Sequence, residues 1–166
     1  KLDCITSHID FFSRTENLEE KVLTQDIIYV GGGNTKSMLA VWKEWNLHNI
    51  LRDAYQKGIV MSGVSAGAIC WFEKGITDSF AETLNIIDCL GLVEGISCPH
   101  FDEEKEREPY VNDVIQRGII ESCICIEGNC ALHIKNDFEY SSIDFGNGKK
   151  CFLVTKDNNN LIKEII

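Results

Sequence analysis

Residues 58–70 constrain the fold of this chain more than any other segment. Apolar β-branched residues lead into Gly63-Val64-Ser65-Ala66-Gly67, and small helix-forming residues follow. This order predicts a strand, a sharp turn and a helix. Because glycine lacks a Cβ, the two glycines that flank Ser65 remove the atoms that would clash in so tight a corner. The G-x-S-x-G spacing is typical of a nucleophile elbow, so Ser65 is the first candidate for a reactive residue.

Composition sets limits on what the chain can do. A length of 166 residues fits a single domain, 1–166, and 44% hydrophobic residues is ordinary for a globular protein. The net charge of −10 argues against binding to nucleic acid or to an anionic membrane. No segment has the length and hydropathy of a membrane span or the pattern of a leader peptide, so we expect a cytoplasmic protein.

The cysteines are numerous but do not indicate a metal site. There are eight, without any C-x-x-C pair or the paired Cys and His spacing that zinc sites use. We expect them to be reduced thiols, mostly buried, in a protein that binds no metal.

Strand-like and helix-like segments alternate over the first two thirds of the chain. Residues 26–30 form a continuous apolar run that ends at three glycines, which predicts a strand buried on both faces. The alternation predicts an α/β fold, a three-layer α/β/α arrangement with a mostly parallel sheet. After residue 130 the apolar period changes to two, which predicts a C-terminal antiparallel β-meander with strands at 130–134, 138–145, 150–155 and 161–166.

In a parallel sheet the turns after the strands meet at one edge, and there a serine needs a base. His100 is the candidate, because it lies in a loop after Ser65 and is held between a proline and a phenylalanine. The other three histidines lie in an early loop, on a helix and inside an alternating strand. We therefore predict that His100 is the general base.

The carboxylate that would orient this base has two candidates. Glu127 directly follows an apolar strand and precedes Gly128, and Asp78 lies in irregular chain beyond Ser65. We interpret the acidic run 102–106 as the first turn of a helix, where negative charge complements the helix dipole.

The glycines before Asn34 could provide a backbone donor. The run Gly31-Gly32-Gly33 lacks the spacing of a dinucleotide-binding loop. We expect instead that the N–H groups of Gly33 and Ala66 form an oxyanion hole for a tetrahedral intermediate.

Four motifs together resemble one known family. Ile-Tyr-Val-Gly-Gly-Gly-Asn-Thr (28–35), Gly-Val-Ser-Ala-Gly-Ala (63–68), Pro-His-Phe (99–101) and Glu-Gly-Asn (127–129) occur in the order and spacing of the dipeptidase E family. These are serine peptidases, also called aspartyl dipeptidases, and are related to cyanophycinase. The resemblance covers roughly residues 2 to 160 and implies a class I glutamine amidotransferase-like fold.

The resemblance also implies roles for single residues. Ser65 would be the nucleophile, His100 the base and Glu127 the third member, with Asp78 as the alternative acid. Gly33 and Ala66 match the oxyanion hole. Asn34 and Arg107 would bind substrate, and Arg107 falls near the place where such enzymes carry an arginine for an acidic side chain.

The expected function is hydrolysis of small peptides through an acyl-enzyme, including dipeptides with an N-terminal aspartate, without a metal or an organic cofactor. The resemblance implies a first strand, loop and helix of about sixty residues that we do not find here, so we expect either a truncated chain or that these residues are supplied otherwise. The strand edge left open by that loss leaves room for a homo-oligomer. The alternatives are a non-catalytic binding domain, a truncated inactive homologue of the same fold and a small acyl esterase.

Overall fold

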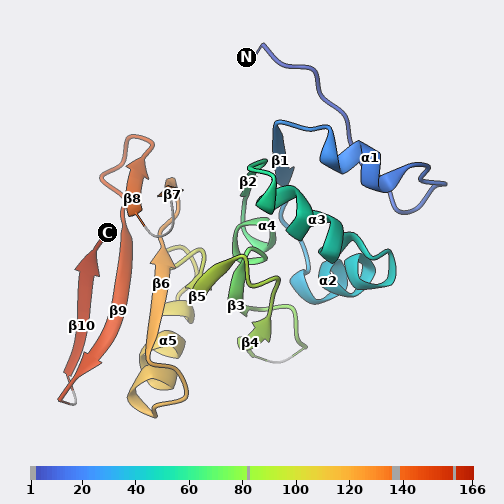
Figure 1. The fold of residues 1–166 in the computed structure, drawn as a ribbon. Coiled ribbons are helices and arrows are strands. Elements are labelled where there is room, and N and C mark those ends of the chain that lie inside the picture. Colours follow the sequence, from blue (N-terminus) through green and yellow to red (C-terminus); the bar gives the residue numbers. More distant parts are fainter. Residues whose placement is uncertain (1–2, 82, 136–138, 159) are drawn as a thin grey trace.

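The computed structural model of the chain describes residues 3–81, 83–135, 139–158 and 160–166, which form a mixed α/β fold (Figure 1). Its helices are α1 (Leu18–Leu23), α2 (Thr35–Glu44), α3 (Leu47–Gln56), α4 (Ala66–Ile69) and α5 (Arg107–Gln116). Its strands are β1 (Ile27–Val30), β2 (Val60–Gly63), β3 (Phe72–Thr77), β4 (Asn85–Asp88), β5 (Val93–Cys98), β6 (Ser122–Ile126), β7 (Cys130–Lys135), β8 (Glu139–Asp144), β9 (Cys151–Asp157) and β10 (Asn160–Ile165).

The described strands form three sheets. The largest has the order β10-β9-β6-β5-β3-β4, with parallel pairing of β3, β5 and β6 in its centre and antiparallel pairing toward both edges. Strands β1 and β2 form a separate parallel pair, and β7 and β8 form an antiparallel hairpin. The expected mixed α/β fold with parallel central strands is therefore confirmed, whereas the three-layer arrangement stays a prediction.

The C-terminal region differs from the predicted single meander. It consists of two hairpins, of which β9–β10 extends the large sheet through β6, while β7–β8 is a sheet of its own. Residue 138, at which the second predicted strand begins, lies outside the described residues. The split arises because β9 takes the place next to β6 and not next to β8.

Strand β1 is not buried on both faces as its sequence predicts. The side chains of Ile27 and Tyr29 are on one face and are 62% and 67% exposed. Its partner β2 adds Val60, which is 56% exposed and lies opposite Ile27. The apolar run reflects burial of the other face, where Ile28 and Val30 pack against a hydrophobic core.

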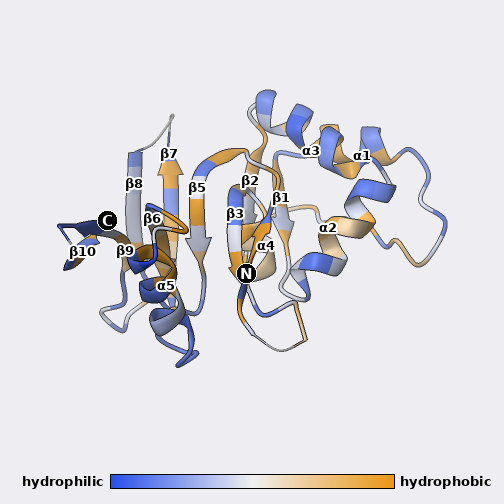
Figure 2. Ribbon diagram, turned by 90° about the horizontal axis from the view of Figure 1, so that it is seen from below, coloured by the Kyte–Doolittle hydropathy of each residue, from blue (hydrophilic) through white to orange (hydrophobic). Residues whose placement is uncertain are grey.

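Two hydrophobic cores hold the fold together. One lies among helices α1 to α3 and includes Trp42, Leu51 and Cys70, and the other lies around α5 and the large sheet and includes Cys98 and Val111. Helices α1, α2 and α3 lie together near β1, whereas α5 lies beside β6 (Figure 1). Figure 2 shows hydrophobic residues along β5 and β7 and hydrophilic ones on β10.

All eight cysteines are free thiols, as expected. Cys70, Cys98, Cys123, Cys125 and Cys151 are buried. Within the described residues, the helices are too short or too polar for any of them to cross a membrane.

Candidate active site

Ser65 lies at the turn between β2 and α4. Its backbone has φ 56° and ψ −118°, a conformation that non-glycine residues rarely adopt. The helix begins at the next residue, Ala66, so the Ala66 N–H is one of the amides that a helix cannot pair internally. The predicted order of strand, sharp turn and helix is confirmed, although the helix is only four residues long.

The two glycines of this turn are needed for close packing. A Cβ on Gly63 would lie 2.2 Å from the carbonyl oxygen of Gly67, and a Cβ on Gly67 would lie 2.1 Å from the carbonyl oxygen of Val30. Neither glycine has a positive φ. Their role is therefore to let β1, β2 and α4 approach one another, which holds the turn at the end of β1.

The glycine turn after β1 passes directly beside Ser65. A Cβ on Gly32 would lie 3.3 Å from the Ser65 Cβ. Gly33 has φ 147°, which a side chain would strain. The predicted oxyanion donors, Gly33 and Ala66, thus belong to the two turns that meet at Ser65.

His100 follows β5 and contacts Ser65. It too has a positive φ, 55°, and the N–H of Phe101 donates to the carbonyl of Ile126 at the end of β6, which holds the loop at that strand. The Nε2 atom of His100 lies 2.9 Å from the Ser65 Oγ. The structure therefore joins the predicted nucleophile and the predicted base by a hydrogen bond.

The carboxylate next to His100 belongs to Glu103. Its Oε2 lies 2.7 Å from the His100 Nδ1. The acidic run 102–106 was predicted to start a helix, but α5 begins only at Arg107, and residues 101–106 form turns. In these turns the N–H groups of Glu103 and Glu104 both donate to the His100 carbonyl, which folds the Glu103 side chain back toward the imidazole.

Neither predicted acid lies in this position. The Glu127 Oε2 accepts a hydrogen bond of 3.0 Å from the Lys150 N–H, and the Asp78 Oδ1 lies 3.9 Å from the Arg107 Nη2. The geometry corrects the choice of Glu127, and of Asp78 as its alternative: Glu103 is the carboxylate in contact with His100. The turns at residues 101–106, closed on the His100 carbonyl, are what bring the Glu103 carboxylate to the imidazole.

The two predicted substrate ligands contact other parts of the chain. Asn34 caps α2, with its Oδ1 accepting from the Ser37 N–H at 2.9 Å and its Nδ2 donating to the Ser79 carbonyl at 3.2 Å. The Arg107 side chain is 3% exposed; its Nε donates to Glu104 at 2.7 Å and its Nη1 to the Ile76 carbonyl at 2.9 Å. Arg107 is thus a buried structural cation in this fold.

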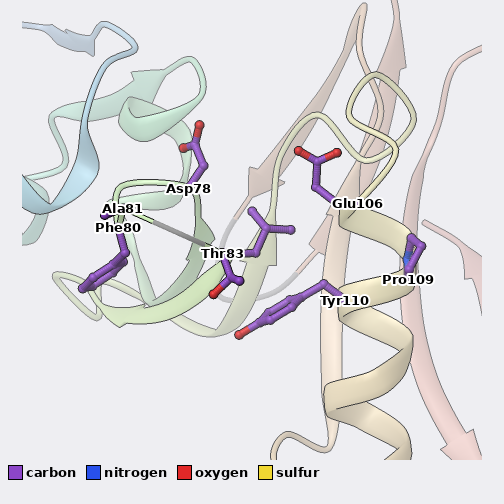
Figure 3. Close-up of a pocket in the computed structure, with 8 residues that line it drawn as sticks. Asp78, Phe80, Ala81, Thr83, Glu106, Pro109 and Tyr110 are labelled. Atoms are coloured by element: carbon purple, nitrogen blue, oxygen red, sulfur yellow. The ribbon is translucent and has the colours of Figure 1, made fainter.

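A cavity of about 640 Å³ lies between the loop after β3 and helix α5 (Figure 3). The bond from Asn34 to Ser79 joins this loop to the start of α2, directly after the glycine turn. The cavity is lined by Asp78, Phe80, Ala81, Thr83, Leu84, Glu106, Pro109 and Tyr110. Among the described residues, no cluster of three or more His, Cys, Asp or Glu side chains could hold a metal ion.

The sequence pattern of peptidase family S51 matches residues 1–139. The chain belongs to peptidase family S51. This S51 chain is 43% identical over 154 residues to the uncharacterized peptidase YgaJ of Bacillus subtilis (strain 168), an alignment that covers 92% of this chain and 66% of that protein. It is also 29% identical over 108 residues to the uncharacterized peptidase Lin0382 of Listeria innocua, covering 61% of this chain and 49% of that protein.

The fold is also similar to a solved structure. The crystal structure of a putative peptidase E protein from Listeria monocytogenes EGD-e superposes with a TM-score of 0.51 at 17% identity, covering 90% of this chain and 64% of the other. This S51 chain therefore spans about two thirds or less of the length of each of these proteins. The resemblance to the dipeptidase E family is confirmed by these matches.

Two features of this S51 chain were not predicted from its motifs: the role of Glu103 and its contact with Gly128. The sequence holds two signals for Glu103. It lies three positions after His100, and it belongs to an acidic run that Pro109 follows closely. The contact of Gly128 with Glu103 has no signal in the sequence, because it depends on the pairing of β5 with β6, which brings the two turns together.

Proposed function

We propose that this chain carries the catalytic centre of a serine peptidase, with Ser65 as nucleophile, His100 as general base and Glu103 as the group that orients the base. One observation carries the proposal, the continuous hydrogen-bonded series from Ser65 Oγ through both ring nitrogens of His100 to Glu103. A nucleophile, a base within reach and a carboxylate on the far side of the imidazole is the arrangement that acyl transfer requires.

The direction of each hydrogen bond follows from the chemistry of the groups. An ionised carboxylate only accepts, so the His100 Nδ1 carries the proton and donates it to Glu103. The Nε2 is then the bare nitrogen, which accepts from the Ser65 hydroxyl. Attack of Ser65 Oγ on the peptide carbonyl carbon transfers the hydroxyl proton to Nε2 and leaves an imidazolium that the Glu103 carboxylate stabilises.

The remaining steps use the same groups. The negative oxygen of the tetrahedral intermediate would be stabilised by the N–H groups of Ala66 and Gly33, each worth on the order of 3 kcal/mol. When the intermediate collapses, the C–N bond breaks and Nε2 returns its proton to the leaving amine. A water molecule, deprotonated by His100, then hydrolyses the ester on Ser65 and regenerates the hydroxyl.

The substrate class is short peptides, without a requirement for aspartate. An acidic side chain would need a cation that is not already paired, and Arg107 donates to Glu104 and to a backbone carbonyl. The cavity near the glycine turn has the carboxylates of Asp78 and Glu106 beside the rings of Phe80 and Tyr110. The Lys36 ammonium already lies 4.7 Å from the centroid of the Phe80 ring, so the two carboxylates are the groups that favour a positively charged amino group in this cavity.

The test is covalent labelling with a fluorophosphonate, followed by a panel of dipeptide amides and esters. We expect the chain to be labelled at Ser65, and Ser65→Ala to lose both labelling and turnover. The matched control is Ser141→Ala, which removes an exposed hydroxyl on β8. Equal labelling of Ser65→Ala and the unmodified chain would contradict the proposal, and turnover of esters without amides would identify an esterase instead.

A further inference from the structure

The turn Glu127-Gly128-Asn129 is a motif of the sequence that the proposed mechanism does not use. In the structure it packs against the side chain of Glu103. A Cβ built on Gly128 would lie 2.3 Å from both the Cδ and the Oε1 of Glu103 and 2.7 Å from its Cγ. These distances are far below van der Waals contact, so the Glu103 carboxylate occupies the space that any side chain at position 128 would need.

The two turns are also fastened to each other beside this contact. The Gly128 N–H donates to the Asp102 Oδ1 at 2.7 Å, and the Asp102 Oδ2 pairs with the Lys149 ammonium. Desolvation acts to raise the pKa of the Asp102 carboxyl, but the Lys149 and Gly128 donors outweigh it and the pKa is lowered. The residue directly before Glu103 is therefore held as a carboxylate against the 127–129 turn.

Position 128 restricts a side chain that is otherwise free to move. The Glu103 side chain is 48% exposed, and its Oε2 lies 2.7 Å from the His100 Nδ1. A glutamate in such a place samples several rotamers, and fixing one of them costs conformational entropy. The space left by the missing Cβ of Gly128 accommodates the rotamer in which Oε2 reaches the His100 Nδ1.

We propose that Gly128 is a positioning residue of the catalytic site, because its missing Cβ leaves the space in which Glu103 reaches His100. The inference rests on the proposed function and extends it to a residue that touches neither the nucleophile nor the base. It also gives the Glu-Gly-Asn motif a physical role, since the glycine and not the glutamate of this motif serves the imidazole.

The contact predicts an unusual outcome for Gly128→Ala. Gly128 does not have a positive φ, so alanine fits its backbone, and the atoms that must yield are the end of a flexible side chain. Glu103 can rotate into solvent at little cost in stability, and in doing so it leaves His100. We expect the protein to remain folded and kcat to fall by on the order of 10² or more, with a much smaller change in KM.

The experiment is a double-mutant cycle of Gly128→Ala and Glu103→Ala. If Gly128 acts through Glu103, the double variant has the kcat of Glu103→Ala alone, because the group that the alanine displaces is already gone. Multiplication of the two effects would overturn the inference, as would wild-type kcat in Gly128→Ala. A large fall in its melting temperature would also overturn it, since the clash would then act on the backbone.

A second readout does not depend on turnover. Nitrogen-15 NMR reports which ring nitrogen of His100 carries the proton, and proton NMR detects the hydrogen-bonded Nδ1–H. We expect Gly128→Ala and Glu103→Ala to lose this Nδ1–H signal alike, and its retention in Gly128→Ala would overturn the inference. If the unmodified chain is neither labelled nor active, the proposed function fails, and the NMR comparison still decides whether Gly128 positions Glu103.

Discussion

Ser65 and His100 meet through a hydrogen bond of 2.9 Å, and both have a positive φ, 56° and 55°. Backbone conformations of this kind cost about 1–3 kcal/mol each and persist only where the surroundings impose them. Here the close packing of Gly63 and Gly67 imposes the conformation of Ser65. The hydrogen bond from the Phe101 N–H to the end of β6 imposes that of His100. With these conformations the two side chains, each just beyond the end of a strand, meet in a hydrogen bond.

Glycine at position 65 should relieve this strain, whereas alanine should not. We expect Ser65→Gly to be more stable than Ser65→Ala by about 1 kcal/mol, since glycine adopts a positive φ without steric cost. Urea denaturation of the two inactive variants measures the difference. Equal stability would show that the backbone at Ser65 is not strained.

The glycines around Ser65 should not tolerate alanine. A Cβ at either position would lie within 2.2 Å of a backbone carbonyl oxygen, which cannot rotate away. We expect Gly63→Ala and Gly67→Ala each to lose about 3 kcal/mol of stability. Gly31→Ala is the control for stability, because a Cβ there has no atom within 4 Å. A cost for Gly31→Ala as large as the others would refute the steric explanation.

Arg107 should act on stability and not on substrate choice. Replacing it with methionine leaves the Ile76 carbonyl and the Glu104 carboxylate without their donor, so we expect a loss of about 3 kcal/mol. The ratio of kcat/KM for an aspartyl dipeptide to that for a neutral dipeptide should stay unchanged. A selective loss of aspartyl turnover in a stable variant would restore Arg107 as a substrate ligand.

Two desolvated thiols, the partly buried Cys89 and the buried Cys151, should make the fold sensitive to alkali. Desolvation by burial raises the pKa of Cys89 from 9.0 to about 12, with a contribution from Asp88, and burial together with the hydrogen bond between Cys151 and Cys130 raises that of Cys151 to about 12. In the unfolded chain these thiols ionise near their ordinary pKa. Their contribution is therefore complete below about pH 9 and is lost as the pH rises toward about 12.

Urea midpoints measured from about pH 8 to pH 11 test this dependence. We expect the midpoint to fall with rising pH, and to fall less steeply in a Cys89→Ala and Cys151→Ala double variant. An identical slope in the double variant would exclude these thiols as the cause.

The sequence predicted the local turns better than the sheet that assembles them. The elbow at Ser65 and the loop at His100 are specified by glycines and a proline within a few residues. Strand β3, by contrast, has no regular apolar period, because Glu73, Lys74 and Gly75 interrupt it. Its place in the sheet depends on pairing with β5, a contact that no local pattern encodes.

The acid was missed for a related reason. Glu127 was predicted because it follows a strand, and it does follow β6. Its carboxylate, however, accepts a hydrogen bond from the Lys150 N–H. Whether Glu103 extends a helix or turns back to His100 depends on the positive φ of His100 and on the space over Gly128. Both depend on the folded backbone, and neither appears in the composition of the acidic run.

The two halves of the candidate site are attached to different cores. Ser65 lies between Met61 and Cys70, which belong to the core among α1 to α3, whereas Cys98 and Phe101, on either side of His100, belong to the core around α5. A shift of about 1 Å between the Ser65 turn and the His100 loop would part the serine from the histidine, a displacement that can cost about 10²-fold in rate. The proposed activity would therefore depend on the alignment of the two cores as well as on the packing of each.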